Sequence, residues 1–333
     1  MHLHFLGICG TFMGSLAQLA KSAGHQVSGC DDNVYPPMST QLQKAGIDLI
    51  EGFDPAQLNP APDLIVVGNA LSRGNPCVEY ILDQKLPYIS GPQWLGDNFL
   101  KDKHVISVSG THGKTSTSSM LAKILDSADY NPGYLIGGVP QDFGISARLG
   151  GTAPDGNHYF VIEADEYDTA FFDKRSKFVH YHSDCLIINN LEYDHADIFD
   201  DLAAIQRQFH HCVRILPSNG NLIYPANDSA VLEVIDRGCW SHKQSFGTAN
   251  ANWQYQLLSE DGSQFEIIHA NSNQRGTISW QQSGLHNVNN ALAAVVAANQ
   301  VGVNLKQACE ALSLFIGIKR RMEPIYSERN LTV

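Results

Sequence analysis

The sequence predicts an α/β protein made of two successive units, each built on a mainly parallel β-sheet with helices on its faces. Three observations lead to this fold class. Short apolar segments alternate with helical patterns through residues 1–100, and a second alternation of the same kind begins near residue 101. After Asn221 the segments alternate polar and apolar residues, which predicts a small antiparallel flap in the second unit.

The first unit is predicted to contain short strands that are closed by turns. We expect strands at residues 3–6, 26–30, 63–67 and 87–89. After the first of them, Gly7-Ile-Cys-Gly-Thr-Phe-Met-Gly14 leads into a helix, in which Leu16, Leu19 and Ala20 repeat at helical spacing. Ligands of such sheets bind beyond the carboxyl ends of the strands, so these turns are candidate ligand contacts.

The glycines of this first turn are spaced G-x-x-G-x-x-x-G. The dinucleotide fingerprint is G-x-G-x-x-G, and Cys9 stands where its middle glycine would be. The turn is therefore weak evidence for NAD. A purely structural turn and a diphosphate site both remain open for Gly7 and Gly10.

A stronger motif follows the strand that we expect from His104. Gly110-Thr-His-Gly-Lys-Thr-Ser116 is a glycine-flanked turn that opens a helix. Its backbone N–H groups can converge on phosphate oxygens, Lys114 adds a positive charge, and the Thr115 hydroxyl suits magnesium. Val108 replaces the first glycine of the G-x-x-x-x-G-K-[ST] pattern. The strand before the turn and the helix after it favour phosphate binding over a chance match.

Two later predicted strands are followed by polar residues at their carboxyl ends. The strand from Tyr159 runs into Glu163, and the strand from Cys185 runs on to His195. Polar residues after strands are common without any function. Parallel strands nevertheless bring Glu163, His195 and the phosphate turn to one edge of a sheet, where we expect a nucleotide with its metal.

The last hundred residues contain two further motifs. The flap is expected from the stretches 253–257, 264–268 and 276–280. Gly284 then begins a helix rich in small residues, and its first turn presents His286, Asn287 and Asn290. The final motif, 315–323, is a basic segment with the character of a hinge.

Composition narrows the function classes. A chain of 333 residues can hold two domains, and its net charge of −12 argues against nucleic acid as a partner. No apolar run reaches the roughly 18 residues of a membrane span. The seven cysteines are scattered without a C-x-x-C pair, which predicts neither disulfides nor a zinc site. We therefore expect a cytoplasmic protein without a membrane partner.

Taken together, these motifs resemble the Mur ligase family, whose ATP-dependent enzymes join amino acids or peptides to UDP-N-acetylmuramate. Five motifs occur in the order of the family, and an ordered set is far more specific than any one member. They are Gly-Thr-His-Gly-Lys-Thr, Glu-Ala-Asp-Glu, Asp-His-Ala-Asp, Gly-Leu-His-Asn-Val-Asn-Asn-Ala and Phe-x-Gly-x-x-Arg-Arg-x-Glu.

The resemblance implies a domain plan. Residues 1–100 would be a Rossmann-like domain for the UDP-sugar, and residues 101–318 a central ATP-binding domain of P-loop ATPase-like α/β fold. Residues 319–333 would be a linker toward the amine-binding C-terminal domain of the family, which we expect this chain to lack. The chain would then bind its substrates without completing ligation.

The resemblance also implies roles for individual residues. Lys114 and the turn would hold the phosphates of ATP. Thr115 and Glu163 would bind one Mg²⁺ ion, and Glu163 and His195 would bind a second Mg²⁺ ion. A metal-site lysine of some members has no counterpart at residues 200–216. The implied ATP-binding residues are Gly110, Thr111, His112, Gly113, Lys114, Thr115, Ser116, His286, Asn290 and Arg321. The implied UDP-sugar contacts are Gly7, Gly10, Thr11 and Asn69.

Several finer stretches are similar to one branch of the family, among them residues 34–39, 73–77, 90–94 and 170–180. That branch joins the tripeptide L-Ala-gamma-D-Glu-meso-diaminopimelate to UDP-N-acetylmuramate through an acyl phosphate during cell-wall recycling. Ligation of L-alanine is the sibling alternative. A dehydrogenase would leave Lys114 and Glu163 without a role, and a folylpolyglutamate-synthase-like ligase would lack the first unit. A non-catalytic nucleotide-binding fragment also stays open.

Overall fold

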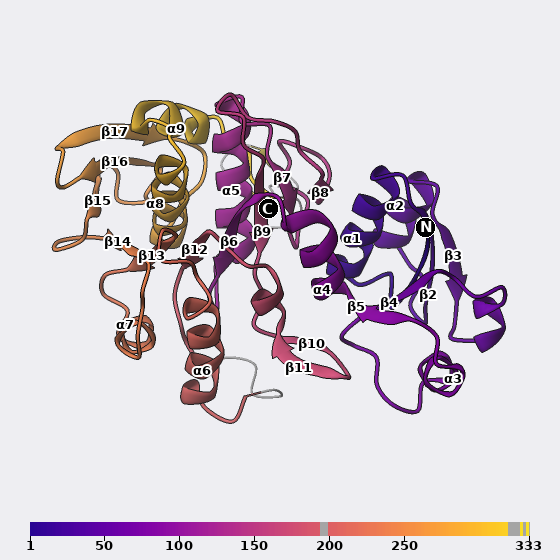
Figure 1. Ribbon diagram of the computed structural model, residues 1–333. Helices are drawn as coiled ribbons and strands as arrows, with labels where there is room; N and C mark the ends of the chain where they lie inside the picture. The colour runs from indigo at the N-terminus through magenta and orange to yellow at the C-terminus, as the bar shows by residue number, and fades with distance from the viewer. Residues whose placement is uncertain (194–198, 319–326, 329–330, 333) are drawn as a thin grey trace.

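Five parallel strands form the first sheet, in the order β3-β2-β1-β4-β5. The computed structural model describes residues 1–193, 199–318, 327–328 and 331–332, and Figure 1 shows this sheet beside the N-terminus. The chain runs outward on both sides of β1, so the ends of β1 and β4 flank a switch point where ligands of such sheets bind. The strands are β1 (His2–Leu6), β2 (Gln26–Asp31), β3 (Asp48–Glu51), β4 (Leu64–Val67) and β5 (Tyr88–Ser90).

Helices cover both faces of this sheet. Alternate residues of β1 point to opposite faces, so Phe5 and Leu6 enter different apolar clusters. The face of Phe5 is covered by α1 (Thr11–Ser22), α2 (Met38–Lys44) and α4 (Gly91–Leu95). The face of Leu6 is covered by the short helix η1 (Pro55–Leu58) and by α3 (Pro76–Gln84).

The second sheet has ten strands, in the order β17-β16-β15-β14-β13-β12-β6-β9-β7-β8. From β7 through β15 all neighbouring strands are parallel, whereas β8, β16 and β17 join in antiparallel pairs. The strands are β6 (His104–Ser109), β7 (Gly133–Leu135), β8 (Ala147–Arg148), β9 (Tyr159–Glu163), β12 (Cys185–Ile188), β13 (Asn221–Pro225), β14 (His242–Gly247), β15 (Trp253–Leu257), β16 (Gln264–His269) and β17 (Gln274–Ser279).

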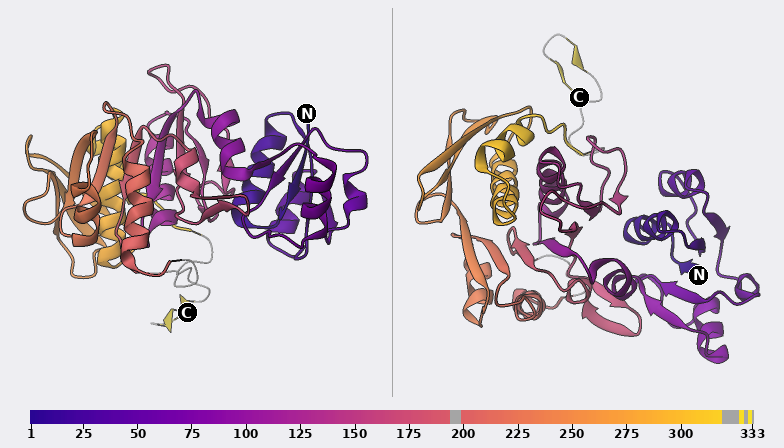
Figure 2. Two further views of the ribbon diagram at one scale, coloured as in Figure 1. Left: turned by 60° about the horizontal axis from the view of Figure 1, so that its bottom comes forward. Right: turned by 45° about the horizontal axis from the view of Figure 1, so that its top comes forward.

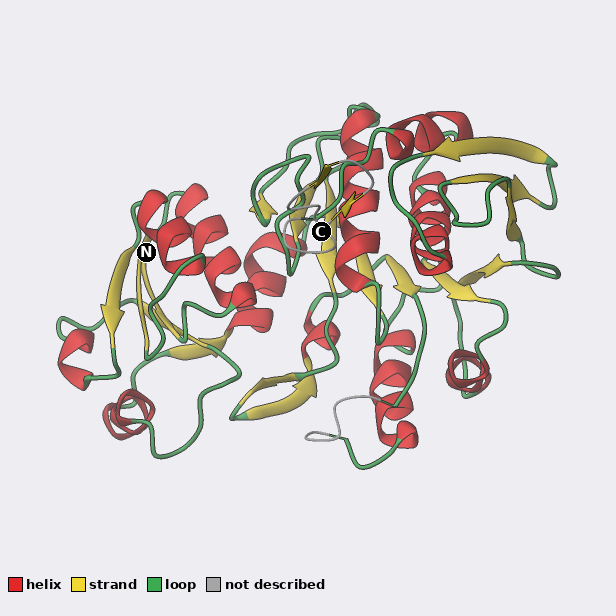
Figure 3. Ribbon diagram, turned by 180° about the vertical axis from the view of Figure 1, so that it is seen from behind, coloured by secondary structure: helices red, strands yellow, loops and turns green. Residues whose placement is uncertain are grey.

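Two groups of helices cover the second sheet. One group is α5 (Lys114–Ser127), α8 (Leu285–Gln300) and α9 (Leu305–Ser313), and the other is α6 (Leu202–Val213) and α7 (Ser229–Asp236). Figures 1 and 3 show the two groups on opposite sides of the strands. The alanines in the middle of α8 are buried against α5, because small side chains allow the two helices to lie close together.

One apolar cluster extends across both units and forms a shared core between them. Helices α1 and α4 lie between the sheets, and buried Trp94 of α4 contacts Phe5 of the first sheet at a ring distance of 6.3 Å. The Ser15 and Ser146 hydroxyls make a buried hydrogen bond of 2.7 Å between the units. The views in Figure 2 show the first unit beside the second. The sheet changes between β5 and β6, and we propose that the domain boundary near residue 100 lies there.

A hairpin of the second unit reaches the edge of the first. It consists of β10 (Asp168–Ala170) and β11 (Asp173–Ser176), and the short helix η3 (Lys177–His180) follows it. At its tip, the rings of Phe172 and Tyr88 pack edge to face at 4.9 Å.

The predicted α/β fold is confirmed, including the antiparallel segment after Asn221. This segment is not a detached flap, because β15 pairs in parallel with β14 and so extends the central sheet. None of the 12 helices in the described part of the chain, short ones included, is long and apolar enough to cross a membrane.

Candidate active site

The turn from Gly110 to Ser116, here called the phosphate-type turn, lies at the carboxyl end of β6 and leads into α5. Two of its glycines have backbone conformations that other residues rarely adopt, with φ of 128° at Gly110 and 82° at Gly113. Space is also limited, because a Cβ atom at Gly113 would collide with the side-chain amide of Asn290. Among the described residues no side chain caps α5. Its N-terminal N–H groups therefore remain available to an anion.

Two asparagines after β12 hold this turn in place. The backbone N–H of His112 donates to Oδ1 of Asn190 at 2.8 Å, and Nδ2 of Asn190 donates back to the His112 carbonyl at 3.1 Å. Asn189 donates to the Thr117 hydroxyl at 2.9 Å and to Asn290 at 3.4 Å. Asn189 and Asn190 were not predicted as site residues, although their position at the end of β12 could have indicated a role beside the turn.

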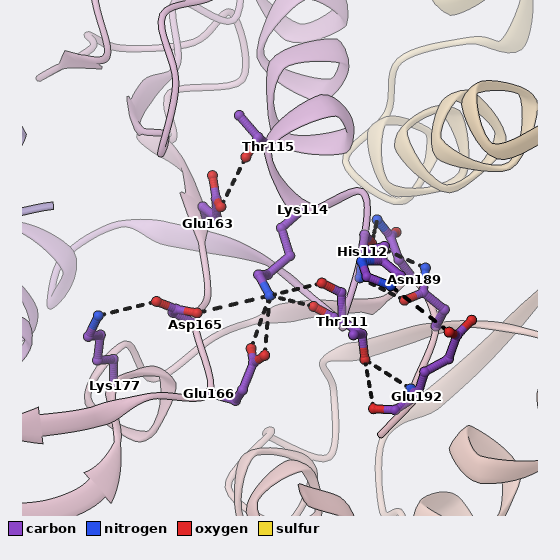
Figure 4. Close-up of polar contacts among 12 residues, drawn as sticks. Thr111, His112, Lys114, Thr115, Glu163, Asp165, Glu166, Lys177, Asn189 and Glu192 are labelled. Carbon is purple, nitrogen blue, oxygen red and sulfur yellow. Dashed lines mark hydrogen bonds and ion pairs between the residues drawn. The ribbon is translucent and has the colours of Figure 1, made fainter. Parts of the chain in front are cut away.

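The Lys114 ammonium folds back across the turn. It donates to the Gly110 carbonyl at 2.6 Å and to Glu166 at 3.1 Å, and it lies 3.9 Å from Asp165 (Figure 4). The side chains of Lys114 and Glu166 are only 11% and 3% exposed. Burial raises the pKa of Glu166, and the positive charge of Lys114 partly opposes this shift.

Glu163 lies at the end of β9, beside the first turn of α5. Its carboxylate accepts one hydrogen bond from the Thr115 hydroxyl at 3.1 Å and another from the Gly137 N–H at 2.7 Å. Burial raises the pKa of Glu163, while these two hydrogen bonds oppose the rise. A half-buried carboxylate next to a hydroxyl is an oxygen donor pair of the kind that hard divalent cations prefer.

Hydrogen bonds to residues of β2 hold the turn after β1 in place. The N–H groups of Gly7 and Ile8 donate to the Cys30 carbonyl, and the Cys9 N–H donates to Oδ2 of Asp31 at 2.9 Å. Gly7 has a φ of 78°, whereas Gly10 has an ordinary φ of −63°. No described side chain caps α1, so this helix too offers N-terminal N–H groups to an anion.

One cavity of about 1420 Å³ joins the two units. It brings together all four predicted UDP-sugar contacts, Gly7, Gly10, Thr11 and Asn69, with Glu163 of the second unit. Asp165 and Lys177, which were not predicted as site residues, line the same cavity. The turn of the first unit and the carboxylate beside α5 thus open into one space.

A second cavity of about 1320 Å³ lies on the other side of the phosphate-type turn. Its walls include His112, Gly113 and Ser116 of the turn, together with His286 and Asn290 from the first turns of α8. The structure therefore brings these predicted ATP-binding residues together. His195 and Arg321 lie outside the described residues, and their predicted roles stay predictions.

The chain is similar to known proteins along most of its length. The model of the Mur ligase family, catalytic domain, matches residues 2–102, and that of the Mur ligase middle domain matches residues 108–298. UDP-N-acetylmuramate--L-alanyl-gamma-D-glutamyl-meso-2,6-diaminoheptandioate ligase of Escherichia coli (strain K12) is 54% identical over 97% of this chain and 69% of its own length. UDP-N-acetylmuramate--L-alanine ligase of Acetivibrio thermocellus is 31% identical over 100% of this chain and 68% of its own.

A solved structure is similar to this chain over almost the full length of both. The crystal structure of UDP-N-acetylmuramate:L-alanyl-gamma-D-glutamyl-meso-diaminopimelate ligase from Neisseria meningitides superimposes with a TM-score of 0.90 and 52% identity. The match covers 96% of this chain and 99% of that one. The chain belongs to the Mur ligase family and is a ligase of the Mur type.

Proposed function

We propose that this protein is an ATP-dependent ligase that joins L-Ala-gamma-D-Glu-meso-diaminopimelate to UDP-N-acetylmuramate in cell-wall peptide recycling. The lactyl carboxylate of the UDP-sugar would attack the γ-phosphate of ATP and give an acyl phosphate. The peptide amine would then attack the carbonyl carbon and release phosphate. Two anions must meet in the first step, so positioning and neutralisation of charge have to supply most of the catalysis.

The cavity that joins the two units is the observation that carries this proposal. It runs from the Gly7–Thr11 turn to Glu163, which hydrogen-bonds to Thr115 at the start of α5. A UDP-sugar on the first turn can therefore extend its sugar end toward a nucleotide on the second. A dehydrogenase would need no such connection, and it would leave the contacts of Lys114 and Glu163 unexplained.

In this proposal the phosphates of ATP lie on the turn from Gly110 to Ser116. The uncapped N-terminus of α5 supplies N–H donors, and Lys114 supplies a positive charge. His286 and Asn290 would contact the adenine side, since both line the cavity beyond Gly113. Arg321, outside the described residues, would contact a phosphate. Gly7, Gly10, Thr11 and Asn69 would hold the uridine diphosphate.

The residues beside α5 fit magnesium. Mg²⁺ takes oxygen ligands, and near nucleotides it is commonly held by one or two protein groups together with phosphate oxygens and water. Thr115 and Glu163 offer such a pair, held 3.1 Å apart by their hydrogen bond. His195 would share the second ion with Glu163. When bound, the metal would neutralise charge on the transferred phosphate.

The sibling activity is ligation of free L-alanine. Identity to the tripeptide-adding relative is 54%, against 31% for the L-alanine-adding one, which favours the tripeptide. That the 333-residue chain binds its substrates without ligating stays a prediction, as does its cytoplasmic location. Product formation by the chain, measured at equal tripeptide and L-alanine concentrations, distinguishes ligation of either amine from binding alone.

Ligand titration tests the class of activity first. We expect the chain to bind UDP-N-acetylmuramate more tightly than UDP-N-acetylglucosamine, and to bind neither NAD nor folate, in isothermal titration calorimetry. Tight binding of NAD would move the assignment to a dehydrogenase. Binding of ATP with no response to any UDP-sugar would leave only a nucleotide-binding protein.

A further inference from the structure

Lys177 is a buried lysine on the wall of the cavity that joins the two units. It begins η3, directly after the hairpin, and its side chain is only 9% exposed. Its backbone N–H donates to the Tyr167 carbonyl at 3.0 Å, and the next residue, Phe178, is fully buried in the shared core. The backbone at Lys177 is therefore fixed on both sides of the side chain that carries the ammonium.

The surroundings of the ammonium come from both units. It donates to Oδ2 of Asp165 at 3.2 Å, and it lies 5.7 Å from the ring centre of Phe12 and 5.5 Å from that of Tyr167. Phe12 belongs to the first turn of α1, beside the predicted diphosphate contacts. An ammonium has three N–H donors, so the hydrogen bond to Asp165 leaves capacity for a further acceptor.

Asp165 also connects Lys177 to the phosphate-type turn. Its other carboxylate oxygen lies 3.9 Å from the Lys114 ammonium, and Figure 4 shows Asp165 between the two lysines. Lys114 has acceptors of its own in the Gly110 carbonyl and Glu166. Lys177 thus places positive charge between the first turn of α1 and the residues around Lys114.

We propose that Lys177 binds the lactyl carboxylate of the UDP-sugar and positions it for attack on the γ-phosphate. This inference rests on the proposed function and adds a substrate contact to it. The carboxylate has to approach an anionic phosphate, and a buried cation lowers the repulsion between them. The diphosphate has another anion site, the uncapped N-terminus of α1, so the carboxylate is the anion left for Lys177.

A pair of ligands that differ at the lactyl group tests the proposal. UDP-N-acetylglucosamine lacks the lactyl carboxylate, while the rest of the molecule matches UDP-N-acetylmuramate. In calorimetric titrations, Lys177→Met should weaken binding of UDP-N-acetylmuramate by about tenfold to a hundredfold, the range for one charge-assisted hydrogen bond. Binding of UDP-N-acetylglucosamine should stay within about twofold of the parent.

Lys174→Met is the matched control. Lys174 lies on β11, three residues before Lys177, and pairs with Asp168 at 2.9 Å, but its side chain is 70% exposed. This variant removes the same charge and should leave both affinities unchanged. Lys177→Arg keeps a cation at the site and should retain part of the preference for UDP-N-acetylmuramate, although the geometry of its hydrogen bonds differs.

Each other outcome contradicts the proposal in a distinct way. Equal weakening of both UDP-sugars would place Lys177 at the diphosphate. A lower melting temperature with an unchanged preference for UDP-N-acetylmuramate would make Lys177 a structural partner of Asp165.

If Lys177→Met does not fold, the double variant with Asp165→Asn, which also removes the unpaired carboxylate, is titrated instead. A parent chain that binds neither sugar would overturn the proposed function itself, whatever Lys177 does.

Discussion

The two glycine turns of the molecule use the same backbone device with different polar partners. Each follows the first strand of its sheet and opens a helix that no described side chain caps. The turn after β1 is tied to β2 by Asp31 and the Cys30 carbonyl. The turn after β6 carries Lys114 and Thr115 and faces Glu163 and Glu166.

This difference suggests a division of tasks. A helix N-terminus alone is enough to hold a diphosphate that stays intact. Transfer of a phosphoryl group also requires charge to be neutralised as it moves, and therefore a lysine, a hydroxyl and carboxylates that hold metal. We propose that the first turn only binds and that the second binds and reacts. Four predictions test this division of tasks.

Lys114→Ala should have the largest effect. Loss of the ammonium removes the positive charge at the second turn, so we expect acyl-phosphate formation to fall by about 100- to 1000-fold. Affinity for UDP-N-acetylmuramate should stay unchanged, because the first turn does not contain this residue. Hydroxylamine traps the acyl phosphate as a hydroxamate that can be quantified. The control is Lys306→Ala, at a side chain that is 84% exposed. Hydroxamate formation at the parent rate would contradict the assignment of Lys114 to the phosphates of ATP.

Removal of the proposed metal ligands comes next. Glu163→Ala and His195→Ala should each lower magnesium-dependent ATP use by about 100-fold, within the range for loss of one electrostatic contact to the reacting group. UDP-sugar binding should change little in both variants. The measurement is ADP release as a function of Mg²⁺ concentration. A normal metal dependence in both variants would make these residues ordinary polar groups of strand-end loops.

Matched glycine substitutions compare the two turns directly. Gly113→Ala requires a strained backbone and a collision with Asn290, so it should cost about 2 kcal/mol and weaken ATP binding. Gly10→Ala has an ordinary φ, and its Cβ would lie 3.6 Å from the Gly7 carbonyl oxygen, a normal contact. We expect it to cost less than about 0.5 kcal/mol. Chemical denaturation and ATP titration measure both, and equal costs would refute the contrast.

The smallest effect concerns stability of the ligand-free chain. Burial raises the pKa of Glu163, so its protonated form stabilises the fold below about pH 4.3, and this stability is lost as pH rises through the raised pKa. Glu163→Gln stays neutral and should raise the Tm at pH 8 by about 2 °C, with a smaller gain at pH 5. Glu310→Gln, at an exposed carboxylate, is the control. A lower Tm at pH 8 would contradict this account.

Much of the fold could be predicted because apolar periodicity reports burial. The strands expected at residues 3–6, 26–30 and 63–67 are β1, β2 and β4, within one or two residues at each end. No prediction was made for β3 (Asp48–Glu51) or β14 (His242–Gly247). Half of the residues of β3 and four of the six in β14 are polar, and several of their side chains are exposed. Such edge or half-covered strands are specified by their neighbours more than by their own pattern.

The site was predictable where a motif has its own chemistry and was missed where contacts are tertiary. Lys114, Thr115 and Glu163 could be named because a phosphate turn and a strand-end carboxylate have sequence signatures. Asn190 and Lys177 act across distances of 78 and 12 residues along the chain, to His112 and Asp165. Without coordinates, nothing in one sequence pairs those residues.

The central claim is that the carboxylate of a UDP-sugar held by the first turn attacks a phosphate held by the second. It can be tested with UDP-N-acetylmuramate labelled with ¹⁸O in its carboxylate, incubated with ATP, Mg²⁺ and hydroxylamine. Attack of the labelled oxygen on phosphorus, followed by cleavage at the carbonyl carbon, leaves one labelled oxygen in the released phosphate. We predict this label in the phosphate, in an amount equal to the hydroxamate formed. Hydroxamate together with unlabelled phosphate would contradict the account.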